Sequence, residues 1–296
     1  MSFFRAHWLN ADGQNLKDEG KYAEAEAAYR AAAAARPKWS VPWYNLGLMQ
    51  KYRGRWEDSL ECNLRATALA PGDQAAWWNL GIAATATSKW AIARRAWRSC
   101  GIDMPDGDGP PTMDFGHAPV RLPSSAGGEV VWASRIDPAR AVVGNVPLPT
   151  SGYRWRDVVL NDGAANGHRI HNGKKWPVFD VLERIEQSGY STYIAEAQAD
   201  TSGLAELSHI AERLGGAAED WSASVRMICQ ECSESTLGYD AEAHKRHANH
   251  PGPVQAACGI AARDVEHAHK IVDAWLGARP GTKVQGLRLA TESRGS

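Results

Sequence analysis

The stretch from Trp43 to Pro71 reads WYNLGLMQKYRGRWEDSLECNLRATALAP, and its residue types recur 34 positions further along the chain. Three sets of residues share this spacing: Gly13, Gly47 and Gly81; Tyr22, Trp56 and Trp90; and Pro37, Pro71 and Pro105. A fixed period of this length, with small, aromatic and proline residues in register, is typical of stacked helix pairs. The sequence therefore predicts a helical solenoid in the first third of the chain.

Three copies of this repeat occupy residues 5–106 and resemble the tetratricopeptide repeat family. The second copy contains Trp43-x-x-Leu46-Gly47 and the third contains Trp77-x-x-Leu80-Gly81, whereas the first is degenerate at its start. We expect the glycines to let the two helices of a pair approach closely, and the prolines to end the second helix. The resemblance implies a curved solenoid whose concave face holds another polypeptide.

The resemblance also implies that the first helix of each pair lines a binding groove. The positions expected to bind a partner are polar at one end and aromatic or apolar at the centre. They are Asn10, Gln14, Tyr44, Leu48, Tyr52, Trp78 and Ile82. An apolar stripe with a polar rim is what a protein interface needs. The alternative is that Tyr44, Trp78 and Ile82 pack under a segment of the same chain.

The composition is that of an ordinary globular protein. The chain has 296 residues, of which 44% are hydrophobic and 23% charged, and a net charge of −1, so no basic excess attracts nucleic acid. No apolar run approaches the roughly 20 residues that a membrane helix needs, and the N-terminus lacks the features of a signal peptide. Five cysteines fit a reducing compartment better than a disulfide framework. We expect a cytoplasmic protein with no membrane partner.

The pattern changes after the repeats, so the predicted fold class is α+β. Residues 107–128 are rich in proline and glycine and are expected to form a linker. Residues 129–190 combine β-rich runs with turn signals, which predicts a small antiparallel β-barrel or meander. The expected elements are strands at 129–132, 139–143, 153–160 and 176–179, and a short helix at 180–187.

Residues 191–296 show a different rhythm of strands and helices. The expected strands are 191–199, 221–229, 254–262 and 282–290, and the expected helices are 201–214, with Ser202 as its cap, and 263–277. The order β-α-β-β-α-β predicts a ferredoxin-like α/β sandwich as the last subdomain.

One cluster of residue types points to a metal. Cys229 and Cys232 have the spacing of a zinc knuckle, and His247 and His250 follow them. The histidine spacing is shorter than in most zinc fingers, and a cysteine at a strand end is often a buried apolar residue. A structural zinc ion and no cofactor at all therefore remain as alternatives. The sequence contains no phosphate loop and no nucleophile motif, so an enzyme is not predicted.

A second group combines cations with aromatic rings in the β-rich segment. It consists of Arg154, Arg156, Lys174 and Lys175 with Tyr153, Trp155 and Trp176. Such a combination binds single-stranded nucleic acid where rings and cations share a face. Strand alternation places Arg154 and Arg156 opposite Tyr153 and Trp155. The sequence therefore predicts no nucleic-acid partner.

Three motifs in the second half resemble a group of bacterial tetratricopeptide proteins encoded beside polymorphic toxins. They are Arg135-Ile-Asp-Pro-Ala-Arg-Ala-Val-Val-Gly-Asn-Val-Pro-Leu-Pro149, Asp157-Val-Val-Leu-Asn-Asp-Gly163 and Pro177-Val-Phe-Asp180. The resemblance implies a cytosolic immunity protein that binds one cognate toxin domain and blocks it. The alternatives are an enzyme or metal-binding domain to which the repeats recruit a substrate, and a general adaptor. The sequence leaves the oligomeric state open.

Overall fold

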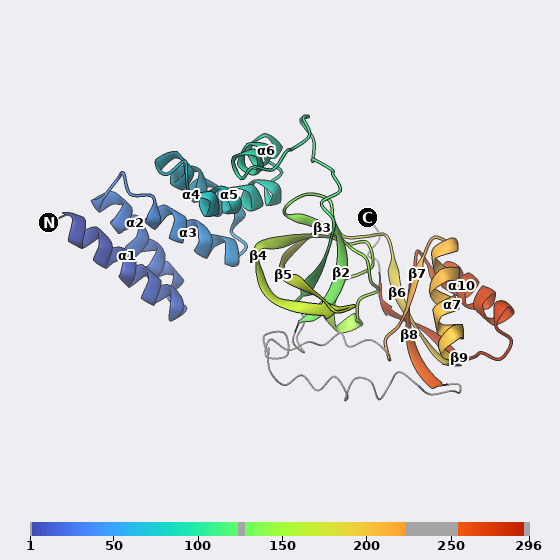
Figure 1. Ribbon diagram of the computed structural model, residues 1–296. Helices are drawn as coiled ribbons and strands as arrows, with labels where there is room; N and C mark the ends of the chain where they lie inside the picture. The colour runs from blue at the N-terminus through green and yellow to red at the C-terminus, as the bar shows by residue number, and fades with distance from the viewer. Residues whose placement is uncertain (1, 124–127, 223–253, 293–296) are drawn as a thin grey trace. The chain divides into compact units, whose positions relative to one another are not determined.

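The computed structural model describes residues 2–123, 128–222 and 254–292 (Figure 1). The chain divides into two compact units. Unit 1 comprises Met1–Met113 and Ile136–Ala139, and unit 2 comprises Asp114–Arg135 and Arg140–Ser296. No helix in the described part of the chain is both long enough and apolar enough to span a membrane.

Unit 1 consists of three consecutive helix pairs. Its helices are α1 (Ser2–Asp18), α2 (Tyr22–Ala35), α3 (Val41–Tyr52), α4 (Trp56–Leu69), α5 (Gln74–Ala86) and α6 (Trp90–Ser99). The second helices of the pairs begin at Tyr22, Trp56 and Trp90, so the period of 34 residues seen in the sequence is also the period of the fold. Each helix packs against the next, as the ribbon shows (Figure 1).

The repeated glycines explain how the two helices of a pair come together. A methyl group on Gly47 would lie 2.7 Å from the amide nitrogen of Asn63, and one on Gly81 would lie 2.5 Å from the ring of Trp97. Both partners lie on the following helix, 16 positions on, so only glycine permits this approach. The turn inside each pair also repeats, because Gly20, Gly54 and Ser88 all have positive φ.

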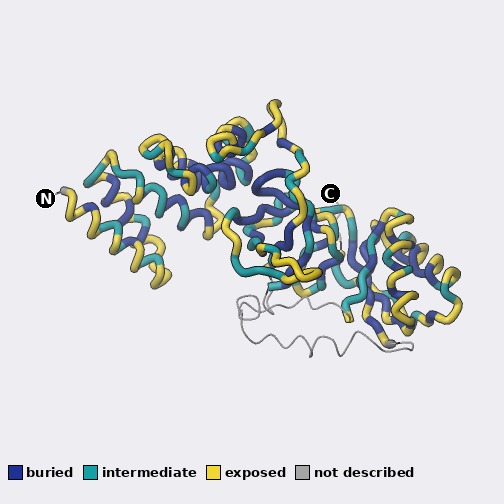
Figure 2. Tube along the Cα trace, viewed as in Figure 1, coloured by how far each residue is buried: buried dark blue, intermediate teal, exposed yellow. Residues whose placement is uncertain are grey.

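The chain after α6 packs back onto that helix. Arg94 donates hydrogen bonds to the carbonyl oxygens of Pro105 and Gly109, and Arg98 donates to that of Met104. A terminal repeat needs such a cover for its last helix. Burial differs along the unit, since α5 is buried over most of its length and α1 is largely exposed (Figure 2).

Unit 2 begins with a closed five-stranded barrel. Its strands are β1 (His117–Leu122), β2 (Glu129–Arg135), β3 (Arg140–Val143), β4 (Val158–His171) and β5 (Lys174–Glu186), with the short 3-10 helix η1 (Pro149–Ser151) after β3. Neighbouring strands are antiparallel, except that β1 and β5 run parallel and close the barrel. The interior is filled by Val120, Leu122, Val131, Ala133, Ala141, Val143, Val159 and Val181.

Three predictions for this region are wrong. The strand expected at 153–160 begins only at Val158, because residues 153–157 form a turn in which Arg156 has positive φ. The predicted linker at 107–128 contains β1, whose strand character depends on pairing with β2 and with the distant β5. The predicted helix at 180–187 is the second half of β5, and this hairpin has bulges between Val158 and His168. Bulges interrupt the alternation of side chains by which a strand is recognised in a sequence.

The C-terminal part of unit 2 is a four-stranded antiparallel sheet with strand order β7-β8-β6-β9. Its elements are β6 (Ser191–Ala199), α7 (Thr201–Arg213), β7 (Ala217–Asp220), β8 (Val254–Ala262), α10 (Val265–Ala278) and β9 (Lys283–Thr291). Both helices bury apolar side chains against the sheet, and Trp275 is fully buried among them.

Two details of this part differ from expectation. The cap of α7 is Asp200, not Ser202, because the Asp200 carboxylate accepts hydrogen bonds from the Gly203 amide at 2.6 Å and from the Ser202 hydroxyl at 2.9 Å. The strand expected at 221–229 is preceded by β7, which ends at Asp220, and residues 223–229 lie outside the described residues.

The barrel and the sheet of unit 2 are joined by polar contacts. The Glu219 carboxylate accepts hydrogen bonds from the Asn145 side chain at 2.7 Å and from the Val146 amide at 2.9 Å. The Trp221 indole donates to the Val146 carbonyl oxygen at 3.0 Å. These contacts attach the loop after β3 to the end of β7.

Candidate protein-binding site

A pocket of about 570 Å³ lies in unit 1 between α2, the start of α3 and α4. Its lining is mostly apolar and carries two arginines. The residues are Arg30, Ala33, Ala34, Pro37, Trp43, Arg65, Ala68 and Leu69. The run of five alanines at 31–35 leaves this space open, since the alanine side chains of α2 do not reach across to α4.

Trp43 contributes an aromatic surface to the pocket. The Arg65 guanidinium lies 4.5 Å from the centre of the Trp43 ring, which is the geometry of a cation–π contact. Arg65 also donates a hydrogen bond to Glu61, one turn earlier on α4, at 2.8 Å. The ring and the carboxylate thus hold the guanidinium at the rim.

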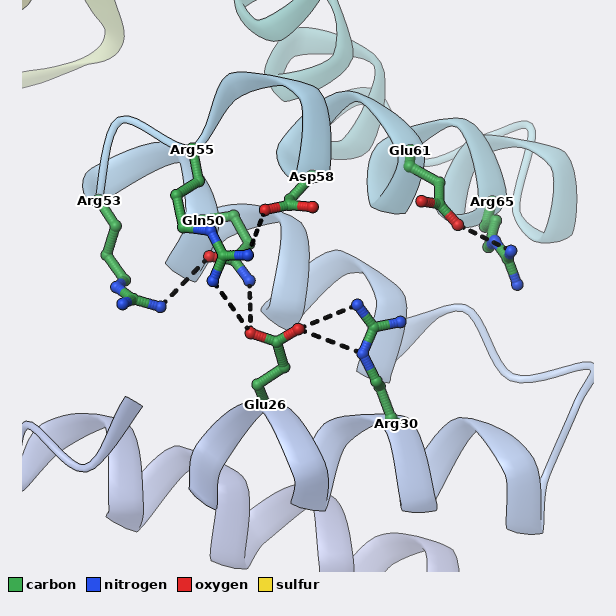
Figure 3. Close-up of polar contacts among 8 residues, drawn as sticks. All are labelled: Glu26, Arg30, Gln50, Arg53, Arg55, Asp58, Glu61 and Arg65. Atoms are coloured by element: carbon green, nitrogen blue, oxygen red, sulfur yellow. Dashed lines mark hydrogen bonds and ion pairs between the residues drawn. The ribbon is translucent and has the colours of Figure 1, made fainter. Parts of the chain in front are cut away.

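The second arginine is held by a network that joins α2, α3 and α4 (Figure 3). Arg30 donates to one oxygen of Glu26 through Nε at 3.3 Å and through Nη2 at 3.0 Å. The other Glu26 oxygen accepts from Gln50 at 2.9 Å and from Arg55 at 3.3 Å. Arg55 also pairs with Asp58 at 2.6 Å. The network holds the Arg30 guanidinium in place through its two hydrogen bonds to Glu26.

The electrostatics of this network follow from the same contacts. Burial raises the pKa of Glu26, but the hydrogen bonds from Arg30 and Gln50 and the charges of Arg30 and Arg55 lower it more, so the pKa lies below its ordinary value. The pKa of Arg30 is raised, chiefly by its hydrogen bond to Glu26. Both groups are therefore ionised near neutral pH.

The thiols of unit 1 are not placed for chemistry. Burial raises the pKa of the Cys62 thiol to about 12, and it also raises the pKa of Cys100. A cysteine reacts as a thiolate, so a raised pKa makes Cys62 inert at neutral pH. Neither cysteine lines the pocket, whose lining combines apolar side chains with two arginines.

The seven residues predicted to line a groove lie on α1, α3 and α5. At the polar end, the Asn45 side chain donates to Asn10 at 3.0 Å, and the Tyr29 hydroxyl donates to Gln14 at 3.4 Å. Tyr44 and Leu48 are half-buried, whereas Tyr52 keeps 60% of its surface exposed.

The centre of that predicted lining is less accessible than expected. Trp78 is half-buried and meets the Trp97 ring edge-on, with 5.2 Å between ring centres. Ile82 has 0% of its surface exposed, so it offers no surface to a partner. The Lys51 ammonium donates to Asn79 at 3.1 Å, and both residues are buried. Periodicity in the sequence does not show how deeply each side chain is buried, and partner binding by this face stays a prediction.

The predicted zinc ligands Cys229, Cys232, His247 and His250 lie outside the described residues. Within residues 2–123, 128–222 and 254–292, no three histidine, cysteine, aspartate or glutamate side chains are grouped so that they could hold a metal ion.

The pocket between α2 and α4 was not among the sites that the sequence predicts. Its sequence signal is the alanine run at 31–35, which stands opposite the Ala68–Leu69 end of α4. The pairing of these two helix ends depends on how neighbouring helix pairs stack. The sequence indicates where each helix ends, but it does not indicate which other helix end lies opposite.

No protein family matches the sequence, and no curated protein matches it. Three solved structures that are similar to part of the chain are TPR domains. The second TPR of Spaghetti (RPAP3), bound to the HSP90 peptide SRMEEVD, is 21% identical with a TM-score of 0.31, and the match covers 32% of this chain and 89% of that chain. The first TPR of Spaghetti, bound to the same peptide, is 23% identical with a TM-score of 0.31, covering 32% and 76%. The Sgt2 TPR domain from Aspergillus fumigatus is 22% identical with a TM-score of 0.30, covering 32% and 63%.

Proposed function

We propose that the chain is a protein-binding module, and that the pocket between α2 and α4 holds part of its partner. The observation that carries this proposal is the pocket itself, with about 570 Å³ of space and a mainly apolar lining. Ligand pockets in proteins have about 300–1,000 Å³, so this space is large enough to hold an apolar side chain of a partner. Trp43 supplies the aromatic surface at which interfaces concentrate their binding energy.

The two arginines of the pocket indicate which kind of partner segment would bind there. Arg30 and Arg65 flank the apolar interior, and each is held in place by one glutamate. A guanidinium has five N–H donors, and one carboxylate oxygen does not occupy all of them. A segment with an apolar side chain next to an aspartate or glutamate therefore fits the site best.

On the resemblance of the three motifs in the second half, we further propose that the partner is a cognate toxin domain and that the chain acts as its immunity protein. The motifs fall on β2, β3, β4, β5 and the loop after β3 in unit 2, except that Ile136–Ala139 of the first motif belong to unit 1. In this proposal unit 2 takes part in recognition of the toxin, and unit 1 contributes the pocket.

A pull-down of the tagged full-length chain from its native host, followed by mass spectrometry, tests the function. A single stoichiometric partner encoded beside this chain supports the immunity proposal. Several weakly bound partners would instead identify a general adaptor, because an immunity protein must discriminate one partner strongly from all others.

Two leucines on α4 give a matched test of the pocket. Leu69 lines the pocket and is 37% exposed, whereas Leu64 is 36% exposed and does not line it. We expect Leu69→Ser to weaken binding of the captured partner about tenfold or more, and Leu64→Ser to leave it unchanged. Equal affinities of the two variants would overturn the pocket assignment. Tyr52→Ala tests the predicted groove. Loss of binding in Tyr52→Ala, with binding kept in Leu69→Ser, would show that the exposed face of α3 and not the pocket binds the partner.

A further inference from the structure

The end of the β4–β5 hairpin gathers cations and rings on one face of the strands. Arg169 is paired with Trp176 across the hairpin, and His171 is paired with Lys174. Residues two apart on a strand share a face, and cross-strand partners share it too. These four side chains therefore belong to one surface of the barrel.

Trp132 from β2 completes this group. Its ring centre lies 5.3 Å from that of His171 and 5.2 Å from that of Trp176, and both contacts are edge-to-face. The Lys174 ammonium is 4.2 Å from the centre of the Trp176 ring, and the Arg169 guanidinium is 5.8 Å from that of Trp132. We call Trp132, Arg169, His171, Lys174 and Trp176 the hairpin cluster.

The charge around the hairpin cluster has one sign. The hairpin end at 168–176 reads HRIHNGKKW, which contains three cations, two histidines and no acidic residue. Lys174, Lys175 and His171 are exposed. An anion that approaches this end of the barrel therefore meets no carboxylate from the hairpin end itself.

The excess of cationic over acidic residues in the barrel region is larger at its surface than in its whole sequence, because more acidic than cationic side chains are buried. Residues 114–135 and 140–190 contain nine lysines and arginines and seven aspartates and glutamates. Three of these carboxylates and two of these guanidiniums are buried, namely those of Glu129, Asp157, Asp162, Arg140 and Arg154. Seven cations and four acidic residues remain at or near the surface, so the excess of positive charge rises from two to three.

We propose that the hairpin cluster binds single-stranded nucleic acid. Aromatic rings next to cations are the arrangement that holds unpaired bases by stacking and their phosphates by charge. Arg169 and Lys174 supply the charges, and Trp176 and His171 supply ring surface.

This set of residues differs from the one that sequence alternation ruled out. Arg154 is buried and donates to the carbonyl oxygen of Glu292, so its role is structural. The Trp155 ring packs against Tyr190 with 4.6 Å between ring centres, away from the hairpin end. Trp132 replaces these residues in the group, and only the pairing of the strands brings it there.

Binding is measured with the full-length chain and a fluorescently labelled strand of about 12 nucleotides, either oligo(dT) or oligo(U), by fluorescence anisotropy. We expect the dissociation constant to rise with salt, with a log–log slope of about 1.4 for two cations on a single strand. Absence of binding at about 50 mM salt would overturn the proposal.

Three variants separate stacking from charge. Trp176→Ala should weaken binding about fivefold or more, and Trp176→Phe should restore most of it, because a phenyl ring still stacks. Lys174→Gln should weaken binding and reduce the salt slope, whereas Lys270→Gln on α10, an exposed lysine in the same unit, should change neither.

An unlabelled polyglutamate chain is the competitor that tests the alternative of an acidic peptide. We expect it to displace the labelled strand much less well than unlabelled oligo(dT), because it offers charge without bases. Equal displacement by the two competitors, together with equal affinities of wild type and Trp176→Ala, would refute base stacking.

Discussion

At Gly81 the two helices of the third pair are so close that a methyl group would lie 2.5 Å from the Trp97 ring. Trp97 is fully buried and contacts Trp78, so the ring has no room to move. Overpacking of this kind costs about 1–3 kcal/mol, against about 1 kcal/mol gained when alanine replaces glycine in a helix. We expect Gly81→Ala to lower the free energy of unfolding, measured by urea denaturation with circular dichroism at 222 nm.

Gly277 on α10 is the matched control for this substitution. It is also helical, and a methyl group there would meet nothing within 4 Å. Gly277→Ala should therefore leave stability unchanged or raise it by up to about 1 kcal/mol. A Gly81→Ala protein as stable as Gly277→Ala would show that the helix pair opens without cost.

At the scale of elements, Glu26 joins α2 to α3 and to the start of α4. Because its folded pKa is lowered, its contribution to stability is present above pH 4.5 and is lost as the pH falls through the folded value. We expect Glu26→Gln to lower the free energy of unfolding at pH 7 by about 1 kcal/mol or less, since the network is partly exposed. This difference should disappear in acid.

The check is urea denaturation of wild type and Glu26→Gln from neutral to acidic pH. Glu61→Gln is the control, because Glu61 contacts a single arginine on its own helix and both side chains are more than half exposed. The Glu61→Gln protein should follow the wild type closely at every pH. A difference between wild type and Glu26→Gln that persists unchanged in acid would mean that the carboxylate charge is not what stabilises the contact.

The β4–β5 hairpin depends on a two-residue turn at Asn172 and Gly173. Both residues have positive φ, at 49° and 71°, which a tight hairpin turn of this hand requires. We expect Gly173→Ala to destabilise the hairpin by about 1 kcal/mol or more, because a side chain is strained in this conformation. Amides at 168–176 should exchange hydrogen faster in the variant, as measured by mass spectrometry.

Gly189 offers the control for the turn. Its φ is not in the positive range and a methyl group there would meet nothing, so Gly189→Ala should leave exchange in the hairpin unchanged. Equal protection of 168–176 in both variants would mean that the hairpin does not depend on the turn. The Asn-Gly dipeptide is also a strong hairpin signal, and it marks β4 and β5 in the sequence more clearly than their side-chain alternation does.

At the scale of the whole molecule, unit 1 contains its own apolar core. Tyr29, Leu46, Met49 and Cys62 cluster between the first two helix pairs, with Trp43 packed against them. We expect a fragment of residues 1–113 to be helical by circular dichroism and to unfold cooperatively on heating. Its melting temperature should be lower than that of unit 1 in the full chain, because the fragment lacks Ile136–Ala139. A fragment without helical signal would contradict the division into units.

Features that arise from nearby residues could be predicted from the sequence. The period of 34 residues appears both in the sequence and in the starts of α2, α4 and α6, because each helix pair is a local structure. In the last subdomain, β6 and β8 have the predicted bounds 191–199 and 254–262. Polar and apolar residues alternate in the second half of β6, and β8 is a short, mainly apolar run, so both could be recognised as strands.

Features that depend on distant residues were decided by the tertiary structure. β1 is a strand because β2 and β5 pair with it, and bulges hide the alternation of β5. The pocket exists because α2 and α4 of successive pairs face each other, and the hairpin cluster exists because β2 carries Trp132 to Trp176. The helix pairs follow from the sequence because helical hydrogen bonds and the side-chain period are local, and strands such as β6 and β8 follow because their residue types are typical of strands. Which surfaces meet, and how deeply each side chain is buried, depended on packing between segments far apart in the chain.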